Sequence, residues 1–325
     1  MTQHRQFTHR TAVRERSPLF VGVSGPSGSG KTKSALRIAD GFRRVDGRKV
    51  FGIDTENHRM EHYASEHTFE HVAFAPPHGP DDYIDAINYC VEQGAGTIVI
   101  DSMSHEHEGT GGVLEIHAAE VERLGGGDRN NFSAWIKPKA ARKRLVNAIL
   151  QCPANIIACF RSREKMQPVK GGQPLDLGWM PIAPDEYVYE MHVNLVFMPM
   201  SNGTPTWNSN MPGEKRVAKL PGQFRDLLIQ SPQIDENIGE QLARWAAGGA
   251  VKAKRQPPRN AQEHLERYAS CADREEFEIL ETARKAAWGK MSSPVKEQFK
   301  AAADLARERL DADAAANAPP DGAAQ

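Results

Sequence analysis

Short apolar runs alternate with amphipathic segments along most of the chain. Residues 19–24 form one apolar run, and beyond Lys31 apolar residues recur at helical spacing until Asp46-Gly47. Residues 49–53 form a second apolar run. Continuous apolar runs of this length are typical of strands buried on both faces, whereas a spacing of three to four residues is typical of a helix. Strand, loop, helix and strand in this order predict a βαβ unit and a parallel sheet.

The same alternation continues toward the C-terminus, and two glycine-rich stretches interrupt it. We expect residues 109–127 and 166–184 to be long mobile loops, and loops of this length at the edge of a sheet are usually functional or disordered. Further helices are expected at 80–94, 135–150 and 233–247, and further strands at 97–100, 154–160, 188–200 and 216–220. The pattern predicts an α/β fold with a mostly parallel central sheet flanked by helices.

Composition divides the chain into five segments. A polar arm rich in His, Arg and Thr precedes the α/β domain, and a basic stretch broken by prolines follows it. The sequence beyond this stretch is helical in composition and ends in a run of Ala, Pro, Asp and Gly. We predict a flexible arm (1–17), an α/β domain (18–248), a linker (249–260), a small helical domain (261–311) and a disordered tail (312–325).

Charge and hydropathy narrow the class of protein and its partners. The formal net charge of the 325 residues is -1, so any contact with a polyanion must come from a local patch. The basic segment from Lys137 to Arg144 could be such a patch, or simply a solvated helix face. No apolar run approaches the ~18 residues that span a bilayer, and the polar N-terminus is no secretory signal. With four cysteines and no C-x-x-C pair, we expect a soluble cytoplasmic protein with reduced thiols.

A phosphate-binding pattern lies between the first predicted strand and helix. Residues 25–32 match G-x-x-x-x-G-K-[ST] at each fixed position. The glycines let the backbone turn its N–H groups toward phosphates, and the N-terminus of the helix favours the same anion. Lys31 would reach the β- and γ-phosphates, and the Thr32 hydroxyl would bind Mg²⁺. The predicted nucleotide contacts are Gly25, Pro26, Ser27, Gly28, Ser29, Gly30, Lys31, Thr32 and Lys33.

Acidic residues follow two other predicted strands. Asp101 ends the run 97–100, where its carboxylate could hold Mg²⁺ beside Thr32, although an Asp before Ser102 could also cap a helix. Glu56 follows the second strand, where it could orient or deprotonate an attacking water, or be an ordinary surface acid. Ligands bind outside the carboxyl ends of the strands in open α/β sheets, so both acids are expected beside the phosphate loop.

Two more polar clusters follow predicted strands. Arg161, Arg163 and Lys165 could sense the γ-phosphate or stabilise charge in the transition state, or they could be solvated loop cations. The run His105-Glu106-His107-Glu108 contains metal-ligating residue types, but it lacks the H-E-x-x-H pattern and a distant further ligand. We therefore favour a polar switch loop over a metal site there.

The four motifs in this order resemble the RecA-like branch of P-loop ATPases, in particular phage-encoded ATP-binding proteins of AAA type. Some members of that group act in single-strand annealing and recombination. The similarity covers about residues 18–248. It rests on Gly-Pro-Ser-Gly-Ser-Gly-Lys-Thr at 25–32, Gly-Ile-Asp-Thr-Glu at 52–56, Val-Ile-Asp-Ser at 99–102 and Phe-Arg-Ser-Arg-Glu-Lys at 160–165.

The resemblance implies an ATPase that uses ATP and Mg²⁺. It implies that Glu56 is the catalytic glutamate and Asp101 the Walker B acid, and it places Arg161 where RecA has a sensor Gln. Lys31 and Arg161 complete the expected catalytic set. The stretches 109–127 and 166–184 would correspond in position to the two DNA-binding loops of RecA, which implies single-stranded DNA as a partner. Active sites between neighbouring subunits are common in RecA-like ATPases, which implies a homo-oligomer.

Two other functions fit the same residues. A phosphate loop of this form also opens several small-molecule kinases, which would need an arginine-bearing lid such as residues 160–165 and an acceptor pocket. Alternatively, the chain could be a nucleotide-gated scaffold with little turnover, whose C-terminal helices bind a protein partner. ATP hydrolysis measured with and without single-stranded DNA separates the DNA-dependent ATPase from the kinase, and a scaffold would show ATP binding with negligible turnover in both conditions.

Overall fold

The computed structural model describes residues 16–229, 233–248, 260–271 and 274–316, together with His9 and Pro258. These residues belong to two compact units, Met1–Val251 and Lys252–Gln325. Apart from a few positions, the predicted arm and linker lie outside the described residues, as does the predicted tail beyond Ala316. The boundaries of these segments therefore stay predictions.

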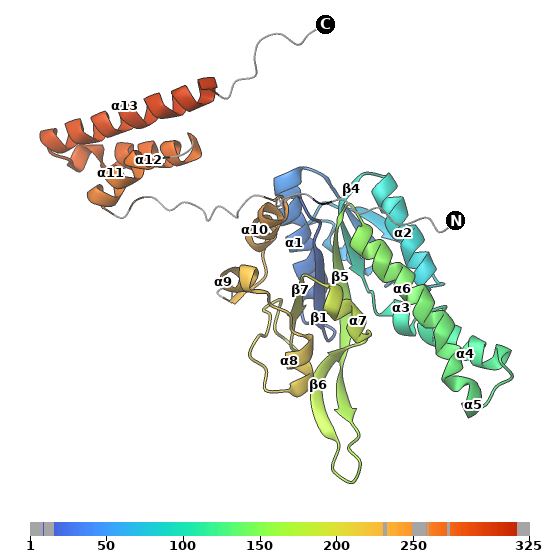
Figure 1. Ribbon diagram of the computed structural model, residues 1–325. Helices are drawn as coiled ribbons and strands as arrows, with labels where there is room; N and C mark the ends of the chain where they lie inside the picture. Colours follow the sequence, from blue (N-terminus) through green and yellow to red (C-terminus); the bar gives the residue numbers. More distant parts are fainter. Residues whose placement is uncertain are drawn as a thin grey trace, which may run out of the picture. The chain divides into compact units, whose positions relative to one another are not determined.

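A seven-stranded sheet forms the centre of the first unit, and its six-strand path runs in the order β3-β2-β4-β5-β1-β7 (Figure 1). Neighbouring strands along this path are parallel, whereas β6 pairs with β5 in the antiparallel direction. The predicted α/β fold with a mostly parallel sheet is therefore confirmed. The strands are β1 (Phe20–Gly25), β2 (Lys49–Asp54), β3 (Glu70–Ala73), β4 (Ala95–Asp101), β5 (Asn155–Gln167), β6 (Leu175–Pro181) and β7 (Val193–Val196).

Helices cover both faces of the sheet. Figure 1 shows α1 (Lys31–Asp46) and α10 (Glu236–Ala246) on one side, and α2 (Pro80–Glu92) and α6 (Ile136–Gln151) on the other. Successive strand residues point to opposite faces, so Val99 packs into the core beneath α1, while Ile98 and Ile100 pack beneath α2 and α6. This alternation between two apolar cores explains why the strands are apolar at nearly every position.

The two glycine-rich stretches contain more regular structure than expected. Residues 109–127 include the helix α4 (Val113–Arg123), which has no glycine of its own and lies between clusters of glycine. Residues 166–184 form the end of β5, a turn and β6, so the expected loop is a β-hairpin. The predicted irregular loops were wrong here because glycine marks the ends of these elements rather than their absence. Three short helices flank α4, namely α3 (His105–Glu108), α5 (Asp128–Asn131) and the 3₁₀-helix η2 (Ser133–Trp135).

The last predicted strands of the α/β unit were also partly wrong. Within 188–200, the strand β7 is short and follows the helix α7 (Asp185–Glu190). Residues 216–220 begin within the helix α8 (Pro212–Val217), and Lys219 then forms an isolated bridge with Asn194. A proline at the first helical turn favours this helix over a strand. The remaining elements are the 3₁₀-helices η1 (Arg59–Tyr63) and η3 (Gly222–Phe224) and the helix α9 (Arg225–Ile229).

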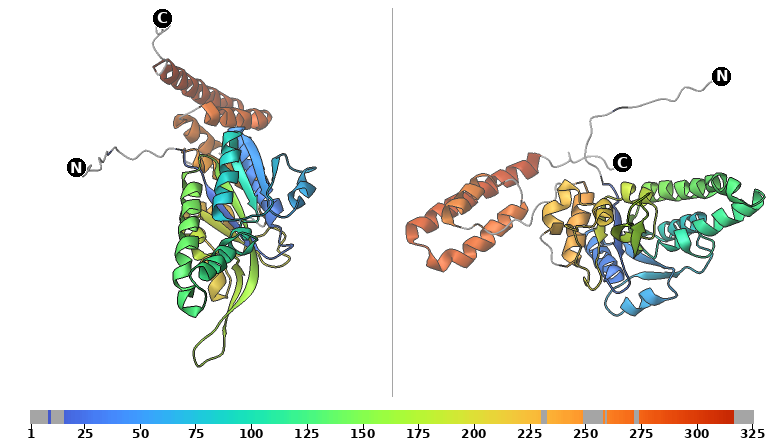
Figure 2. Two further views of the ribbon diagram at one scale, coloured as in Figure 1. Left: turned by 90° about the vertical axis from the view of Figure 1, so that its right-hand side faces the viewer. Right: turned by 90° about the horizontal axis from the view of Figure 1, so that it is seen from below.

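The second unit is helical and has its own core. It consists of α11 (Ala261–Ala269), α12 (Arg274–Ala287), the 3₁₀-helix η4 (Trp288–Lys290) and α13 (Ser293–Ala316), drawn in orange and red in Figure 2. Tyr268, Leu280 and Phe299 are fully buried among these helices. His264 Nε2 lies 2.9 Å from the backbone oxygen of Leu280 and ties α11 to α12. The helix α13 extends to Ala316, past the position at which the predicted tail begins.

Close packing of α1 on α10 leads to a prediction about Gly239. A Cβ atom at this position would lie 2.3 Å from the backbone oxygen of Ile38 on α1. Relieving this clash requires a shift of the α1 backbone. Gly239→Ala is therefore expected to lower the free energy of unfolding by about 1–3 kcal/mol in chemical denaturation. Gly222→Ala is the control, since a Cβ atom there meets nothing within 4 Å. Equal stability of the two variants would contradict the packing.

Candidate functional site

The phosphate-loop motif joins the buried strand β1 directly to α1. Gly28 and Gly30 have φ angles of 77° and 94°, a region that glycine adopts without steric cost. A Cβ atom on Gly30 would also lie 2.6 Å from the backbone nitrogen of Gly203. The loop therefore needs glycine at residue 30 for two reasons, and it delivers the chain to the N-terminus of α1, where backbone N–H groups lack intrahelical partners. Such a helix end is a ready anion site.

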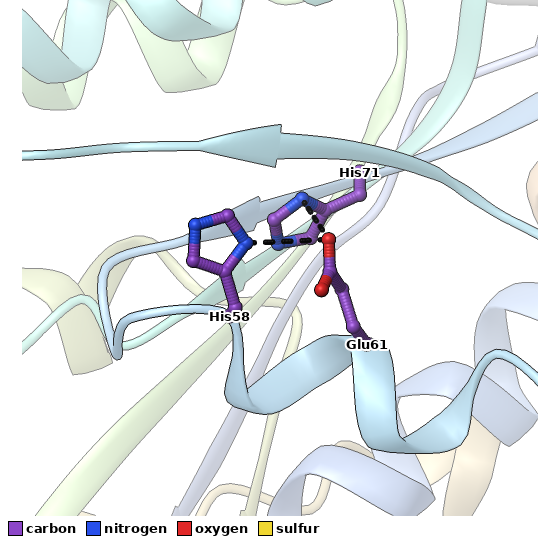
Figure 3. Close-up of side chains that lie close together, drawn as sticks. All are labelled: His58, Glu61 and His71. Atoms are coloured by element: carbon purple, nitrogen blue, oxygen red, sulfur yellow. Dashed lines mark ion pairs between the residues drawn. The ribbon is translucent and has the colours of Figure 1, made fainter.

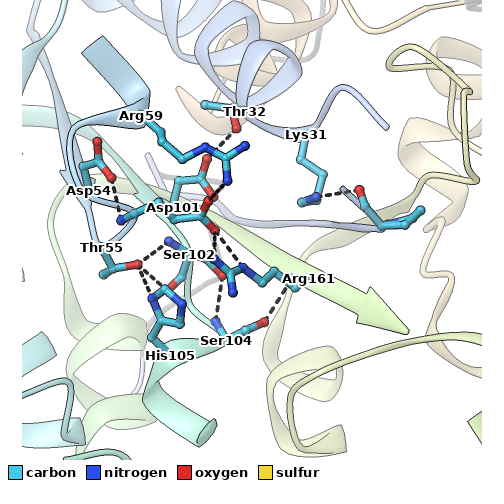
Figure 4. Close-up of polar contacts among 12 residues, drawn as sticks. Lys31, Thr32, Asp54, Thr55, Arg59, Asp101, Ser102, Ser104, His105 and Arg161 are labelled. Carbon is cyan, nitrogen blue, oxygen red and sulfur yellow. Dashed lines mark hydrogen bonds and ion pairs between the residues drawn. The ribbon is translucent and has the colours of Figure 1, made fainter. Parts of the chain in front are cut away.

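Thr32 and Asp101 meet across the sheet. The Thr32 Oγ1 donates a hydrogen bond of 2.5 Å to Asp101 Oδ2, although β4 and β1 are separated by β5 (Figure 4). Burial raises the pKa of Asp101 to about 6, against the lowering effect of the Thr32 hydrogen bond. A hydroxyl and a buried carboxylate at one point offer two hard oxygen ligands.

Lys31 lies beside the same two residues on the first turn of α1. Its Nζ donates to the backbone oxygen of Pro26 at 2.8 Å. Burial lowers the pKa of Lys31, while the carboxylates of Asp101 and Glu56 act in the opposite direction. The side chain thus carries a cation into a part of the site that is partly shielded from water.

Glu56 is held between two arginines. Its Oε1 accepts from Arg161 Nε at 2.8 Å, and its Oε2 accepts from Arg59 Nη1 at 2.7 Å. The Glu56 side chain is only 12% exposed, whereas those of Arg161 and Arg59 are 41% and 64% exposed. Arg161 also pairs in register with Gly25 at the end of β1, so it lies next to the phosphate loop as well as to Glu56. Both predicted residues therefore lie at the predicted edge of the sheet.

Two neighbours of Glu56 fix the backbone on which it sits. Asp54 accepts hydrogen bonds from the N–H groups of Glu56 and Met60 at 2.7 and 2.9 Å. The Thr55 hydroxyl oxygen lies 2.7 Å from both Ser102 N and His105 Nδ1, which links the segment after β2 to the segment after β4 (Figure 4). Sequence reasoning missed these roles, although an acid at the last position of a buried strand was the available signal.

A cavity of about 540 Å³ opens where these side chains converge. Five of the nine predicted nucleotide contacts line it together with Glu56, Asp101 and Arg161, whereas Gly25, Pro26, Ser29 and Lys33 do not. Lys33 instead points to Glu66, and its Nζ lies 2.6 Å from the Glu66 carboxylate. The full lining is Ser27, Gly28, Gly30, Lys31, Thr32, Glu56, Arg59, His62, Tyr63, Asp101, Glu108, Arg161, Ser162 and Ile182.

Residues of the cluster His105 to Glu108 have separate partners. Glu106 is buried and forms an ion pair with Arg142, whose Nε lies 3.0 Å from Glu106 Oε1. His107 Nδ1 also lies 3.0 Å from Arg142 Nη2, while His105 faces Thr55. Arg142 therefore binds α6 to α3. The sequence had suggested a solvated basic face here, which is wrong for Arg142 because its side chain is buried. Burial raises the pKa of Glu106, and Arg142 opposes this shift.

Comparison with known families identifies this arrangement. A family model described as an AAA domain matches residues 17–191, more than half of the chain. The chain belongs to the AAA-domain family of P-loop NTPases. The matched region of this AAA domain contains the phosphate loop, Glu56, Asp101 and Arg161. A search of curated proteins finds no match to the chain.

Two other expectations concern the environment of the AAA-domain protein. All four cysteines, at 90, 152, 159 and 271, are free and buried, as expected for reduced thiols. Among the described residues, no helix combines the length and the apolar character needed to cross a bilayer.

Burial of Asp101 leads to a prediction about stability and pH. The folded-state pKa of about 6 lies above the ordinary aspartate value of 3.8, so the folded protein disfavours the carboxylate. This cost is absent below pH ~4 and fully present above pH ~6. At pH 8, without Mg²⁺ or nucleotide, the free energy of unfolding of Asp101→Asn is expected to exceed that of the wild type by on the order of 1–3 kcal/mol.

The same comparison at pH 4 supplies the control. Asp101 is then largely protonated in both states, so the two proteins should have similar free energies of unfolding. A stability difference that is the same at both pH values would show that the Asp101 charge is not its source.

Proposed function

We propose that the chain binds ATP and hydrolyses it with Mg²⁺ at the cavity beside the phosphate loop. The proposal rests on one observation: Lys31, Thr32, Asp101 and Glu56 line the same cavity although they come from three separate segments. In AAA domains a site of this kind serves a nucleoside triphosphate, which favours ATP here. Loop glycines and the N-terminus of α1 would bind the phosphates, with Lys31 on the β- and γ-phosphates.

The oxygen atoms of Thr32 and Asp101 fit Mg²⁺, which prefers hard oxygen ligands and keeps several waters. The Thr32 hydroxyl donates to Asp101 Oδ2 at 2.5 Å, so the two oxygens lie close enough to hold one Mg²⁺ once this hydrogen bond is released. When bound, Mg²⁺ neutralises charge on the phosphates. Thr32 and Asp101 would orient it from opposite sides of β5.

Glu56 is the residue we assign to the attacking water. A glutamate carboxylate within hydrogen-bond reach of water can orient it or accept its proton. Arg59 and Arg161 compete for this carboxylate, because both guanidinium groups bind it. A γ-phosphate in the cavity would attract the same guanidinium groups and leave Glu56 free for water. Arg161 would then stabilise charge that develops on the transferred phosphoryl group.

Phosphate release from ATP, measured together with binding of a fluorescent ATP analogue, tests the assignment. Glu56→Gln is expected to lower turnover roughly 10²- to 10⁴-fold with ATP affinity retained, because the amide cannot accept the proton. Lys31→Ala is expected to lose nucleotide affinity. Glu92→Gln on α2 is the matched control and should leave both quantities unchanged.

Other outcomes favour the alternatives. Unchanged turnover in Glu56→Gln would remove that residue from the mechanism. Transfer of the γ-phosphate to a small molecule instead of water would indicate a kinase. ATP binding without turnover in the wild type would indicate a nucleotide-gated scaffold.

We further infer that the protein binds single-stranded DNA and uses ATP hydrolysis in phage recombination, annealing or replication. The β5–β6 hairpin supports this inference, because Arg163, Lys165 and Lys170 are exposed on it and Arg161 lies at its base beside Glu56. Cations on an extended hairpin can follow a phosphate backbone. A homo-oligomer, and a protein partner for the C-terminal helices, stay predictions.

The DNA inference has a salt-dependent test. Replacing Arg163 and Lys165 together with Ala is expected to weaken binding of a fluorescent oligodeoxythymidine. The slope of log affinity against log salt should fall by roughly 1.4, about 0.7 for each lost cation. Lys49→Ala is the control, since Lys49 lies at the amino end of β2, away from the hairpin. No salt-sensitive binding and no stimulation of hydrolysis by DNA would overturn the inference.

A further inference from the structure

Two histidines and a glutamate lie close together beside the cavity, and the proposed ATPase mechanism uses none of them. His58 precedes η1, Glu61 lies within η1, and His71 lies on β3 (Figure 3). The Nδ1 atoms of His58 and His71 each lie 3.2 Å from Glu61 Oε1. The three candidate ligand atoms all lie within 4.8 Å of one another.

Both histidine–glutamate distances are close to the separation of two ligands on a tetrahedral metal ion. Zn–N and Zn–O bonds of ~2.0–2.2 Å place two ligands of a tetrahedral Zn²⁺ at ~3.3–3.5 Å from each other. The two N···O separations of 3.2 Å are close to this value. Imidazole and carboxylate are also the ligand types that suit zinc and neighbouring transition metals.

The orientation of His71 adds a second, independent observation. Its Nε2 lies 3.2 Å from Asp54 Oδ2, so its other ring nitrogen, Nδ1, faces Glu61. The Asp54 side chain is buried and is fixed by the N–H groups of Glu56 and Met60. A metal-bound histidine commonly donates its second N–H to a carboxylate, which sets the ring orientation. Asp54 stands in that position toward His71.

We propose that His58, Glu61 and His71 form a binding site for a divalent transition-metal ion of the Zn²⁺ type, with solvent as a fourth ligand. The side chains of His58 and Glu61 are about half exposed, so an ion can enter from solution. The site is distinct from the Mg²⁺ ligands Thr32 and Asp101. It joins η1 to β3, and η1 carries His62 and Tyr63 to the nucleotide cavity.

The full chain is stripped of metal with EDTA and returned to metal-free buffer. Titration with Zn²⁺ in competition with a chromogenic chelator then measures the affinity of the site. The expected result is one Zn²⁺ per chain, with affinity at least 10-fold lower in His58→Ala and in Glu61→Gln. Both residues are exposed, so these variants should keep the circular dichroism of the wild type. His117→Ala is the control, because His117 contacts the backbone of Asn131 outside the site.

Two further readouts separate this site from other metal sites. Co²⁺ bound to histidine and carboxylate should show visible d–d bands without the near-ultraviolet absorption of a cysteine thiolate. Zn²⁺ should raise the melting temperature of the wild type and of His117→Ala, but not of His58→Ala, since binding to the folded state alone stabilises it.

Several results would overturn the proposal. It fails if the wild type binds no Zn²⁺, because two histidine–glutamate ion pairs would then account for the cluster. It also fails if His58→Ala and Glu61→Gln bind Zn²⁺ as tightly as the wild type, or if the bound Co²⁺ has thiolate absorption. None of these readouts depends on ATP hydrolysis.

Discussion

Parallel pairing of β1 and β4 with β5, and of β2 with β4, is the constraint on which the site depends. Parallel strands end at the same edge of a sheet, so residues at their carboxyl ends become neighbours whatever their distance in sequence. Asp54 pairs with Asp101, and Gly25 pairs with Arg161. These pairings bring the phosphate loop, two acids and an arginine to one edge. The helices on both faces bury the apolar residues of β1, β2, β4 and the first half of β5.

The features that sequence predicted are local ones. Apolar runs indicated the strands, and the spacing of Gly25, Gly30, Lys31 and Thr32 indicated the phosphate loop. Asp101 and Glu56 could be placed because Asp101 ends a strand and Glu56 lies two residues past the end of another. Their position at the sheet edge needed no knowledge of side-chain contacts, only of the parallel topology that strand and helix alternation implies.

Features that sequence could not predict are pairings between distant residues. Arg161 and Glu56 are 105 positions apart, and nothing in either local sequence indicates that they bind each other. Arg142 looked like one of several helix cations until its ion pair with buried Glu106 appeared. His58 and His71 lie on different elements, so no spacing rule links them to Glu61. Asp54 connects these sites, since it contacts both the backbone of Glu56 and the ring of His71.

The strand β5 pairs in two ways, in parallel with β1 and β4 and in the antiparallel direction with β6. Its first half, from Asn155, lies between β4 and β1 in the core, and its second half pairs with β6 as far as Gln167. Arg161 lies where these halves meet, ~20 Å along the strand from Gln167 at ~3.3 Å per residue. The register shift between Glu164 and Met166 is the one irregularity along this pairing. One continuous strand therefore connects the hairpin, with its exposed Arg163 and Lys165, to Arg161, which binds Glu56.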